Sequence, residues 1–298
     1  MYRSAYRAAE VLLIRSGLWR GQLKRNASRI DSLLRRLWIG REVPNPAFVD
    51  GHTMFFPPLS HKFYLEMVEG TYEHETTRVI RSLLHPAMNV VDLGAHIGYY
   101  TVLAAREVKP GGRVYAFEPQ HFLLAFLAQN VAANAYEDLV TVVPKAVANR
   151  SGFASLFLGS GAGLTSSLYA GGFNIGDQTI TVDLTTLDEF FHQAGWPKID
   201  LIKMDIEGSE KLALEGMVEL SQRNPHLRLV MEFSPVHIAG GGYTPDDLFG
   251  VLRSLQFSRF TVIDNGLSVL DIPRDISRLV RIAHKHLVPV VNLLCERV

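Results

Sequence analysis

The chain has 298 residues, 47% of them hydrophobic, and its 30 Lys and Arg residues balance its 30 Asp and Glu residues. This length can bury one large core with appendages, and it corresponds to one or two domains. The single cysteine, Cys295, excludes an internal disulfide, and no apolar run reaches the roughly 18 residues that a membrane-spanning helix needs. The run at 11–14 is too short for the core of a signal peptide, so we expect a cytoplasmic protein.

The start of the chain is predicted to be a region of its own. Residues 1–45 hold ten Lys and Arg against three Asp and Glu, a net charge of +7, so the remainder carries −7. One apolar helix face is indicated by residues at helical spacing, namely Ile30, Leu33, Leu34, Leu37 and Trp38. Pro44 and Pro46 end that helix. We expect residues 1–60 to form a basic helical extension that closes with a strand and a loop.

A regular alternation of strands and helices follows a predicted helix over residues 76–84. Strands are expected near residues 89–93, 113–118, 139–143, 200–205, 227–233 and 258–264, with helices between most of them. Such a series forms βαβ units, which give a mostly parallel sheet with helices on both faces. Asn265-Gly266 between two apolar runs predicts a hairpin that adds an antiparallel strand near the C-terminus. The expected fold is α/β, with its main domain over residues 61–273.

Two segments do not fit this alternation. Residues 152–183 are rich in Gly, Ser and Thr, and a stretch of this length is expected to be either a lid over a binding site or a surface hairpin. Residues 274–298 are expected to form a basic amphipathic helix, kinked at Pro289, with an apolar stripe of Ile276, Leu279, Val280, Ala283 and Leu287. Two basic ends allow a peripheral membrane contact, although helices packed on the domain are the simpler interpretation.

The turn after the first predicted strand of this series indicates a nucleoside-binding site. Gly94 follows a buried strand and leads into a helix, and Glu118 ends the next strand 24 residues later, where a carboxylate can accept hydrogen bonds from both ribose hydroxyls. A dinucleotide fingerprint needs glycines where this chain has His96 and Tyr99, so a pyrophosphate would meet side chains. A ligand without phosphates fits better, and Asp92 offers a carboxylate to an ammonium group such as that of S-adenosylmethionine. The alternative is an ordinary strand-turn-helix unit.

At these residues the chain resembles the FkbM-type family of S-adenosylmethionine-dependent O-methyltransferases, which belongs to the Rossmann-like methyltransferase class. The matching pieces occur in order: GTYEHE at 70–75, VDLGAHIGYYT at 91–101, AFEP at 116–119, PKAV at 144–147, IDLIKMDIEGSE at 199–210 and VME at 230–232. His96 departs from the Asn that is usual in the family. The resemblance implies that the methionine end contacts Asp92, Gly94, Ala95 and Gly98, that Glu118 holds the ribose, and that Lys145 and Ala146 lie near the adenine. The other expected cofactor contacts are Glu75, Tyr99, Thr101 and Asp205.

Catalytic groups are expected at the carboxyl ends of the predicted strands near residues 200–205 and 227–233. Asp205 follows a buried strand and is the first candidate for the base that removes the acceptor's proton, with Glu232 and His237 as further candidates. The alternative is that Asp205 or Glu207 caps a helix over residues 209–220. A divalent metal between Asp205 and Glu232 is conceivable, but no tight ligand cluster or zinc spacing is visible in the sequence, and no metal is predicted.

The function that these features favour is S-adenosylmethionine-dependent methylation of a hydroxyl group. By resemblance, the acceptor is a small molecule: a sugar, a glycolipid or a polyketide-like compound. Two alternatives remain open, an NAD-dependent oxidoreductase and a catalytically silent cofactor-binding module. Nucleic-acid binding is not expected, because the body of the chain is acidic and no basic patch with interleaved aromatic residues is present.

Overall fold

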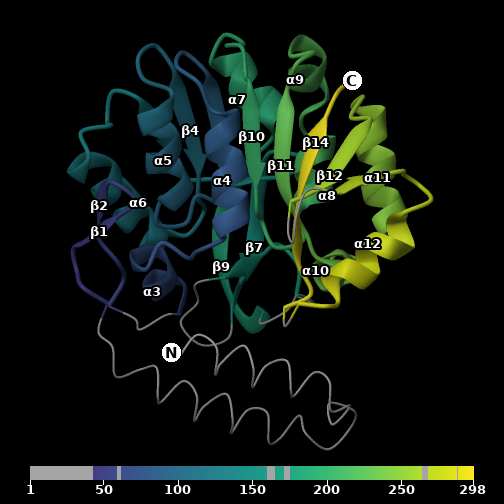
Figure 1. Cartoon of the computed structure of the whole chain (residues 1–298), viewed down its shortest axis with the longest axis horizontal. Helices are drawn as coiled ribbons and strands as arrows, with labels where there is room; N and C mark the ends of the chain where they lie inside the picture. Colours follow the sequence, from purple (N-terminus) through teal and green to yellow (C-terminus); the bar gives the residue numbers. More distant parts are fainter. Residues whose placement is uncertain (1–42, 59–61, 160–164, 171–174, 264–267, 287) are drawn as a thin grey trace, which may run out of the picture. The chain divides into compact units, whose positions relative to one another are not determined.

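The computed structural model describes residues 43–298 except 59–61, 160–164, 171–174, 264–267 and 287 (Figure 1). The helix expected over residues 30–38, and with it most of the basic extension, lies outside the described residues. Residues from Asn45 to Val298 form one compact unit, so the expected domain boundaries at 61 and 273 are too narrow. In the part of the chain that is described, no helix has both the length and the apolar character needed to cross a membrane.

An eight-stranded mixed sheet forms the centre of the unit, in the order β13-β12-β14-β11-β10-β3-β4-β5. The five strands from β11 to β5 are parallel to one another, and the other three pair antiparallel. These strands are β3 (Asn89–Leu93), β4 (Arg113–Phe117), β5 (Val140–Val143), β10 (Leu201–Met204), β11 (Arg228–Phe233), β12 (Arg259–Val262), β13 (Ser268–Leu270) and β14 (Val291–Glu296). The predicted alternation and the β12–β13 pairing are confirmed.

Helices cover both faces of this sheet (Figure 1). One face packs into the main core, where alternate strand residues such as Leu93, Phe117 and Met204 meet α7 (Leu187–Gln193), α8 (Glu210–Glu215), α9 (Val218–Arg223), α11 (Pro245–Ser254) and α12 (Ile276–Ala283). The remaining helices are α3 (Lys62–Val68), α4 (His74–Leu83), α5 (Tyr99–Glu107), α6 (His121–Ala133) and α10 (Pro235–Gly240). Because side chains alternate across a strand, residues on the opposite side, such as Asp92 and Lys203, point away from that core.

The C-terminal segment corrects the prediction of a helix to residue 298. The helix ends at Ala283, and β14 enters the sheet between β11 and β12. The reason is visible in the residues that follow Pro289: Val291, Leu293 and Cys295 are fully buried, and β-branched residues around the proline favour extended backbone. The arginines at this end of the chain are exposed: the side chain of Arg274, just before α12, is 86% accessible, and that of Arg278 in α12 is 52% accessible.

The helix predicted over residues 209–220 is divided into α8 and α9. Gly216 ends α8, and a Cβ atom at this position would lie 2.2 Å from the carbonyl oxygen of Ala148. The Gly216 carbonyl also accepts a hydrogen bond from the backbone N–H of Asp188 at 2.9 Å. Packing against two neighbouring segments therefore breaks a helix that periodicity alone would continue.

The Gly-rich stretch over residues 152–183 is an ordered hairpin in its described parts. β7 (Gly152–Gly159) and β9 (Ile175–Thr185) pair antiparallel and form a four-stranded sheet with β6 (Ala146–Val147) and β8 (Ser166–Ser167). A small cluster of Leu156, Val182, Leu184 and Ala146 stabilises it. Of the two alternatives, a lid and a surface hairpin, the structure shows a hairpin, and alternating apolar residues in β9 bury one side of it. A separate two-stranded sheet consists of β1 (Ala47–Val49) and β2 (His52–Met54).

Candidate active site

The turn after β3 and the loop after β10 meet at the carboxyl edge of the sheet. Gly94 has a φ of +76°, and a Cβ atom there would lie 1.9 Å from the carbonyl oxygen of Asp205, so only glycine fits. The backbone N–H groups of Gly94 and Ala95 both donate to the Phe117 carbonyl, at 3.1 and 2.9 Å. These contacts fix the turn between two parallel strands, where ligands bind in open α/β sheets.

A cavity opens at this edge, with about 140 Å³ of space that the centre of a water molecule can reach. That volume is several times what a single water needs, so the cavity accommodates an extended ligand. Several residues singled out from the sequence line it, namely Gly94, Ala95, Tyr99, Glu118, Lys145, Ala146 and Asp205. Others do not line it, namely Glu75, Asp92, Gly98, Thr101, Glu232 and His237.

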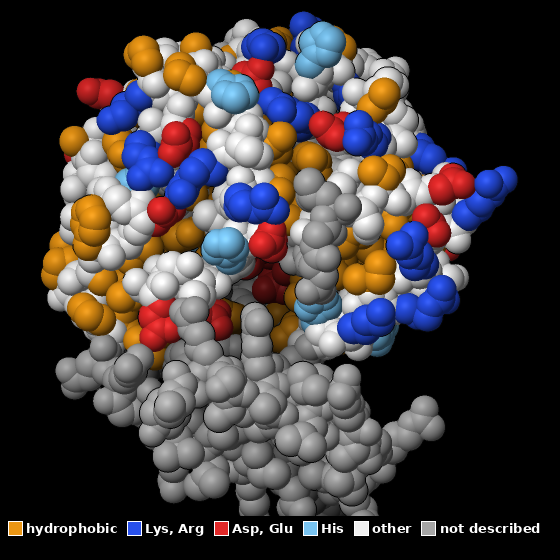
Figure 2. All heavy atoms as spheres, in the orientation of Figure 1, with side chains coloured by type: hydrophobic (Ala, Val, Ile, Leu, Met, Phe, Trp, Pro, Cys, Tyr) orange, Lys and Arg blue, Asp and Glu red, His pale blue; other side chains and the backbone are white. Residues whose placement is uncertain are grey.

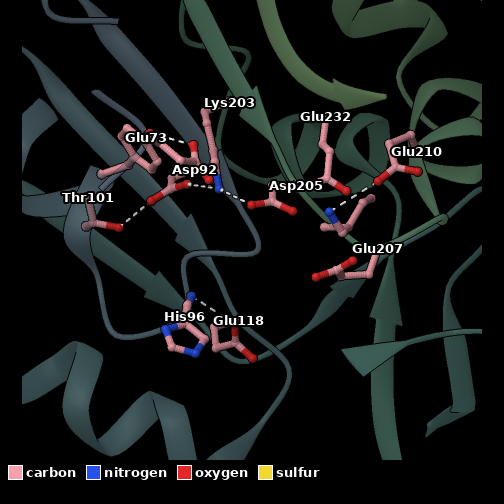
Figure 3. A network of polar contacts seen from close by, with 12 residues as sticks. Glu73, Asp92, His96, Thr101, Glu118, Lys203, Asp205, Glu207, Glu210 and Glu232 are labelled. Atoms are coloured by element: carbon pink, nitrogen blue, oxygen red, sulfur yellow. Dashed lines mark hydrogen bonds and ion pairs between the residues drawn. The ribbon is translucent and has the colours of Figure 1, made fainter. Parts of the chain in front are cut away.

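Glu118 is a buried carboxylate that faces the cavity from the end of β4. It is 4% exposed, and its two oxygens accept hydrogen bonds from the backbone N–H groups of His96 and Gln120, each at 2.9 Å (Figure 3). Each carboxylate oxygen retains a second lone pair for a ligand hydroxyl. Burial raises the pKa of Glu118 to about 7, against the pull of the two N–H donors. The carboxylate is therefore poised to accept two hydroxyl hydrogen bonds.

Lys203 links the turn at Gly94 to the loop that follows β10. Its ammonium lies 3.3 Å from Asp205 Oδ2 and 3.9 Å from Asp92 Oδ1, and the register of β3 and β10 places Lys203 directly beside Asp92 (Figure 3). Burial alone would lower the pKa of Lys203, but the Asp205 and Asp92 carboxylates outweigh it and raise that pKa. The lysine side chain therefore remains charged and fixes the position of the Asp205 carboxylate.

Four of the predicted cofactor contacts do not line the cavity, and their positions explain why. Thr101 is fully buried and donates from Oγ1 to Asp92 Oδ2 at 2.6 Å, so it positions Asp92 behind the cavity wall. Asp92 is 1% exposed and already faces an ammonium group of the chain itself. Glu75 pairs with Arg78 on the surface of α4, at 2.7 Å. Gly98 shapes the start of α5, with a φ of +93°.

Glu207, Glu232 and His237 form a second cluster next to Asp205. The Nδ1 atom of His237 lies 2.9 Å from Glu207 Oε2 and 3.5 Å from Glu232 Oε1. Burial raises the pKa of both glutamates, and their negative charges raise the pKa of His237 to about 11 although burial opposes this. Figure 3 shows Asp205 between Lys203 on one side and Glu207 and Glu232 on the other. Sequence reasoning found each of these residues but did not bring Glu207 together with His237.

The loop that carries Glu207 has an unusual backbone. Glu207 has a φ of +52°, a conformation that costs on the order of 1–3 kcal/mol in a non-glycine residue and that concentrates at functional sites. The next residue, Gly208, lies so close to α10 that a Cβ atom would meet the His237 carbonyl oxygen at 2.8 Å. The Glu210 carboxylate accepts from the N–H groups of Ile206 and Gly208. The alternative that Asp205 or Glu207 caps α8 is wrong, because no side chain caps that helix.

Comparison with known proteins identifies the family. Residues 92–259 match the model of the methyltransferase FkbM domain, which is more than half of the chain. The chain belongs to the FkbM methyltransferase family. Its methyl donor is S-adenosylmethionine. This membership removes the NAD-dependent oxidoreductase alternative, in agreement with His96 and Tyr99 at the cavity wall.

Individual relatives of this FkbM methyltransferase are distant or match it over a short stretch. A protein-L-isoaspartate O-methyltransferase of Aeropyrum pernix is 41% identical over 58 residues, which is 20% of this chain and about a fifth (22%) of that protein. An FkbM methyltransferase structure from Methylobacillus flagellatus is 15% identical, with a TM-score of 0.42, and the match covers 80% of this chain and 56% of that one. An rRNA methylase from Streptococcus thermophilus is 14% identical, with a TM-score of 0.43, over 76% and 96% of the two chains.

The cavity fits S-adenosylmethionine in two respects. The buried Glu118 carboxylate suits the ribose hydroxyls, and Gly94 and Ala95 line the cavity, with Gly94 packed against the Asp205 carbonyl oxygen. Bound there, the cofactor supplies an electrophilic methyl group on a sulfonium centre. The chain's own part is to hold the cofactor and to exclude water.

Proposed function

We propose that this FkbM methyltransferase transfers the methyl group to a hydroxyl oxygen of a small molecule, in the class of sugars, glycolipids and polyketide-like compounds. The observation that carries the proposal is that Asp205 and Glu207 line the same cavity as Glu118. An alcohol has a pKa close to that of water, about 15.7, and therefore needs a base as the methyl group arrives. Carboxylates beside the cofactor site meet that need.

We assign the role of base to Asp205. Its carboxylate lines the cavity, and the Lys203 ammonium at 3.3 Å holds it in one orientation. Fixed geometry matters because methyl transfer requires the nucleophile, the methyl carbon and the sulfur in line. Glu207 lines the cavity, whereas Glu232 and His237 do not. We propose that these two residues support residues 205–208, which we call the catalytic loop. Glu118 is proposed to hold the ribose, with Gly94, Ala95 and Tyr99 near the methionine end and Lys145 and Ala146 near the adenine.

The hairpin of β7 and β9 is proposed to form the acceptor side of the site. Leu156, Thr165, Ser166 and Leu168 from this hairpin line the cavity. The Ser167 hydroxyl donates to the Glu207 carbonyl at 2.6 Å and so ties the hairpin to the catalytic loop. Apolar and hydroxyl side chains together suit a partly hydrophobic, hydroxylated acceptor.

A nucleic-acid acceptor is disfavoured by charge. Acidic side chains gather in the hollow on the face drawn in Figure 2, and Asp205, Glu207 and Glu118 line the cavity itself. Phosphate backbones bind surfaces rich in Lys and Arg, whereas acidic side chains gather in this hollow (Figure 2). A small neutral acceptor meets no such repulsion.

The proposal is tested by methyl transfer into a mixture of candidate acceptors. The protein is incubated with S-adenosylmethionine that carries an isotopic label in the methyl group, together with an extract of its native host. The labelled product is then identified by mass spectrometry. A labelled methyl ether supports the proposal, and a label on nitrogen or carbon contradicts it. Cofactor binding without any transfer would instead favour the catalytically silent module.

We also propose that the basic ends of the chain allow peripheral contact with anionic membranes. The proposal is supported by the charge of +7 over residues 1–45 and by the exposed side chains of Arg274 and Arg278. Co-sedimentation with vesicles of anionic lipid should fall as salt rises and should be lost when residues 1–45 are deleted. Equal co-sedimentation with anionic and neutral vesicles contradicts the proposal.

A further inference from the structure

The cluster of Glu207, Glu232 and His237 has the donor atoms and the spacing of a metal site. One ligand atom of each residue lies within 4.8 Å of the other two. Two ligands at about 2.1 Å from the same ion stand about 3.0 Å apart at a right angle and about 3.4 Å apart at a tetrahedral angle. The distances from His237 Nδ1 to the two carboxylate oxygens, 2.9 and 3.5 Å, match that range.

The imidazole of His237 is the second observation that points to a ligand. The side chain is 5% exposed, and neither ring nitrogen makes a hydrogen bond of acceptable geometry to any part of the chain that is described. Buried polar side chains are normally hydrogen-bonded, whereas the contacts of Nδ1 are the two carboxylate oxygens at 2.9 and 3.5 Å and Nε2 has no hydrogen-bond partner among the described residues. Nδ1 and the two carboxylate oxygens therefore face the point where an ion would sit.

The cluster also requires a positive charge. Glu207 and Glu232 are 21% and 15% exposed, and their carboxylates share the Nδ1 atom of His237 as a neighbour. The nearby ammonium of Lys203 is already engaged by Asp92 and Asp205. Two carboxylates and one imidazole supply three ligands for a divalent cation, which on binding replaces the proton of the His237 imidazole.

We propose that Glu207, Glu232 and His237 bind one divalent first-row transition-metal ion beside the catalytic loop. An imidazole ligand favours Mn²⁺, Co²⁺ or Zn²⁺ over Mg²⁺, which prefers oxygen ligands and retained waters. Three protein ligands leave a position open, and Glu207 is the member that lines the cavity. The catalytic consequence rests on the proposed O-methyl transfer: an acceptor hydroxyl on the ion loses its proton to Asp205 more readily.

Metal binding is tested directly on the full-length protein after removal of metals with a chelator. The protein is titrated with MnCl₂ by calorimetry and with CoCl₂ by visible absorption, which reports coordination by imidazole. The expected result is one saturable site per chain. Glu207→Gln and His237→Asn should each weaken the affinity by at least about 10- to 100-fold, and His237→Asn should alter the cobalt spectrum.

Matched controls show whether a weaker metal affinity results from loss of a ligand at the site or from loss of any carboxylate or imidazole. Glu219→Gln and His226→Asn carry the same changes at exposed positions and should bind both ions like the unaltered protein. Thermal unfolding of every variant identifies loss of fold; if His237→Asn unfolds, the partly exposed Glu207 supplies the decisive variant. Absence of a saturable site, or equal affinity in Glu207→Gln, overturns the proposal and identifies His237 as a cation held by two carboxylates.

Binding of S-adenosylhomocysteine is measured on the same metal-free samples. If the cofactor product binds and methyl transfer occurs without any metal site, the metal proposal fails and the proposed function stands. If the metal binds but the labelled methyl group never reaches an oxygen, the proposed function fails and the metal site stands.

Discussion

Glu118 couples cofactor affinity to pH because burial moves its pKa from 4.5 to about 7. Only the ionised carboxylate accepts hydrogen bonds from two ribose hydroxyls while it keeps those from His96 and Gln120. About nine tenths of the groups are ionised at pH 8 and about one tenth at pH 6. We therefore expect the affinity for S-adenosylhomocysteine to fall about tenfold over that interval.

The same shift affects the stability of the ligand-free protein. The folded protein holds the Glu118 proton more tightly than the unfolded chain does, so this group stabilises the fold fully below about pH 4.5. That contribution is lost as the pH rises to about 7. Since each pH unit corresponds to 1.36 kcal/mol, the free energy of unfolding should lose about 3 kcal/mol from this group. Cofactor binding recovers part of it by supplying partners for the charge.

The substitution Glu118→Gln isolates the effect of the Glu118 charge on cofactor affinity. The amide cannot ionise, so the affinity should lose its pH dependence between pH 6 and 8, and two weaker hydrogen bonds should cost about 2 kcal/mol, roughly 30-fold, at pH 8. Calorimetric titration with S-adenosylhomocysteine measures both quantities. Glu75→Gln, the same change at an exposed residue that does not line the cavity, is the control. A wild-type affinity that is flat from pH 6 to 8, or an equal slope in Glu118→Gln, refutes the reasoning.

Three further substitutions test the site. Asp205→Asn should lower methyl transfer by about 10²- to 10⁴-fold and leave cofactor affinity within a few-fold, because a base acts mainly in the transition state; full activity would remove Asp205 from catalysis. Lys203→Met leaves the buried Asp92 without its cation and should lower the free energy of unfolding in urea by about 3–5 kcal/mol, whereas the double variant Lys203→Met/Asp92→Asn should recover part of that loss; equal instability of the two variants would contradict the pairing. Gly94→Ala should abolish cofactor binding and destabilise the fold by more than Gly242→Ala, since both glycines have φ near +75° but only Gly94 has a carbonyl oxygen within 2 Å of the added Cβ; equal effects would show that backbone strain alone decides.

Much of the architecture follows from local patterns. Short apolar runs between helical segments are enough to predict β3, β4, β5, β10, β11 and β12, and Asn265-Gly266 is enough to predict the β12–β13 pairing. The candidate site follows in part from the same patterns, because Gly94, Glu118 and Asp205 each lie at the carboxyl end of a predicted strand. These three residues line one cavity because the parallel strands end at one edge.

The remaining features depend on contacts between distant segments. Lys203 becomes central only when β3 and β10 are neighbours in register, which no single segment reveals. Its position two residues before Asp205 was the available signal, since residues two apart in a strand share a face. The approach of Glu207 to His237 requires a left-handed backbone at Glu207 and a glycine pressed against α10. The prediction of a helix to residue 298 is wrong because the helical stripe ends before Pro289, and the place of β14 between β11 and β12 depends on both neighbouring strands.

The placement of β14 has a consequence for synthesis of the protein. In the sheet, β12 pairs only with β13 and β14, and β14 is the link between this pair and β11. A growing chain that has not yet released residues 291–298 therefore exposes two open strand edges, one on β11 and one on β12. Unpaired strand edges favour aggregation, so a nascent chain carries this hazard until residues 291–298 have emerged, and a truncation at residue 290 would retain it.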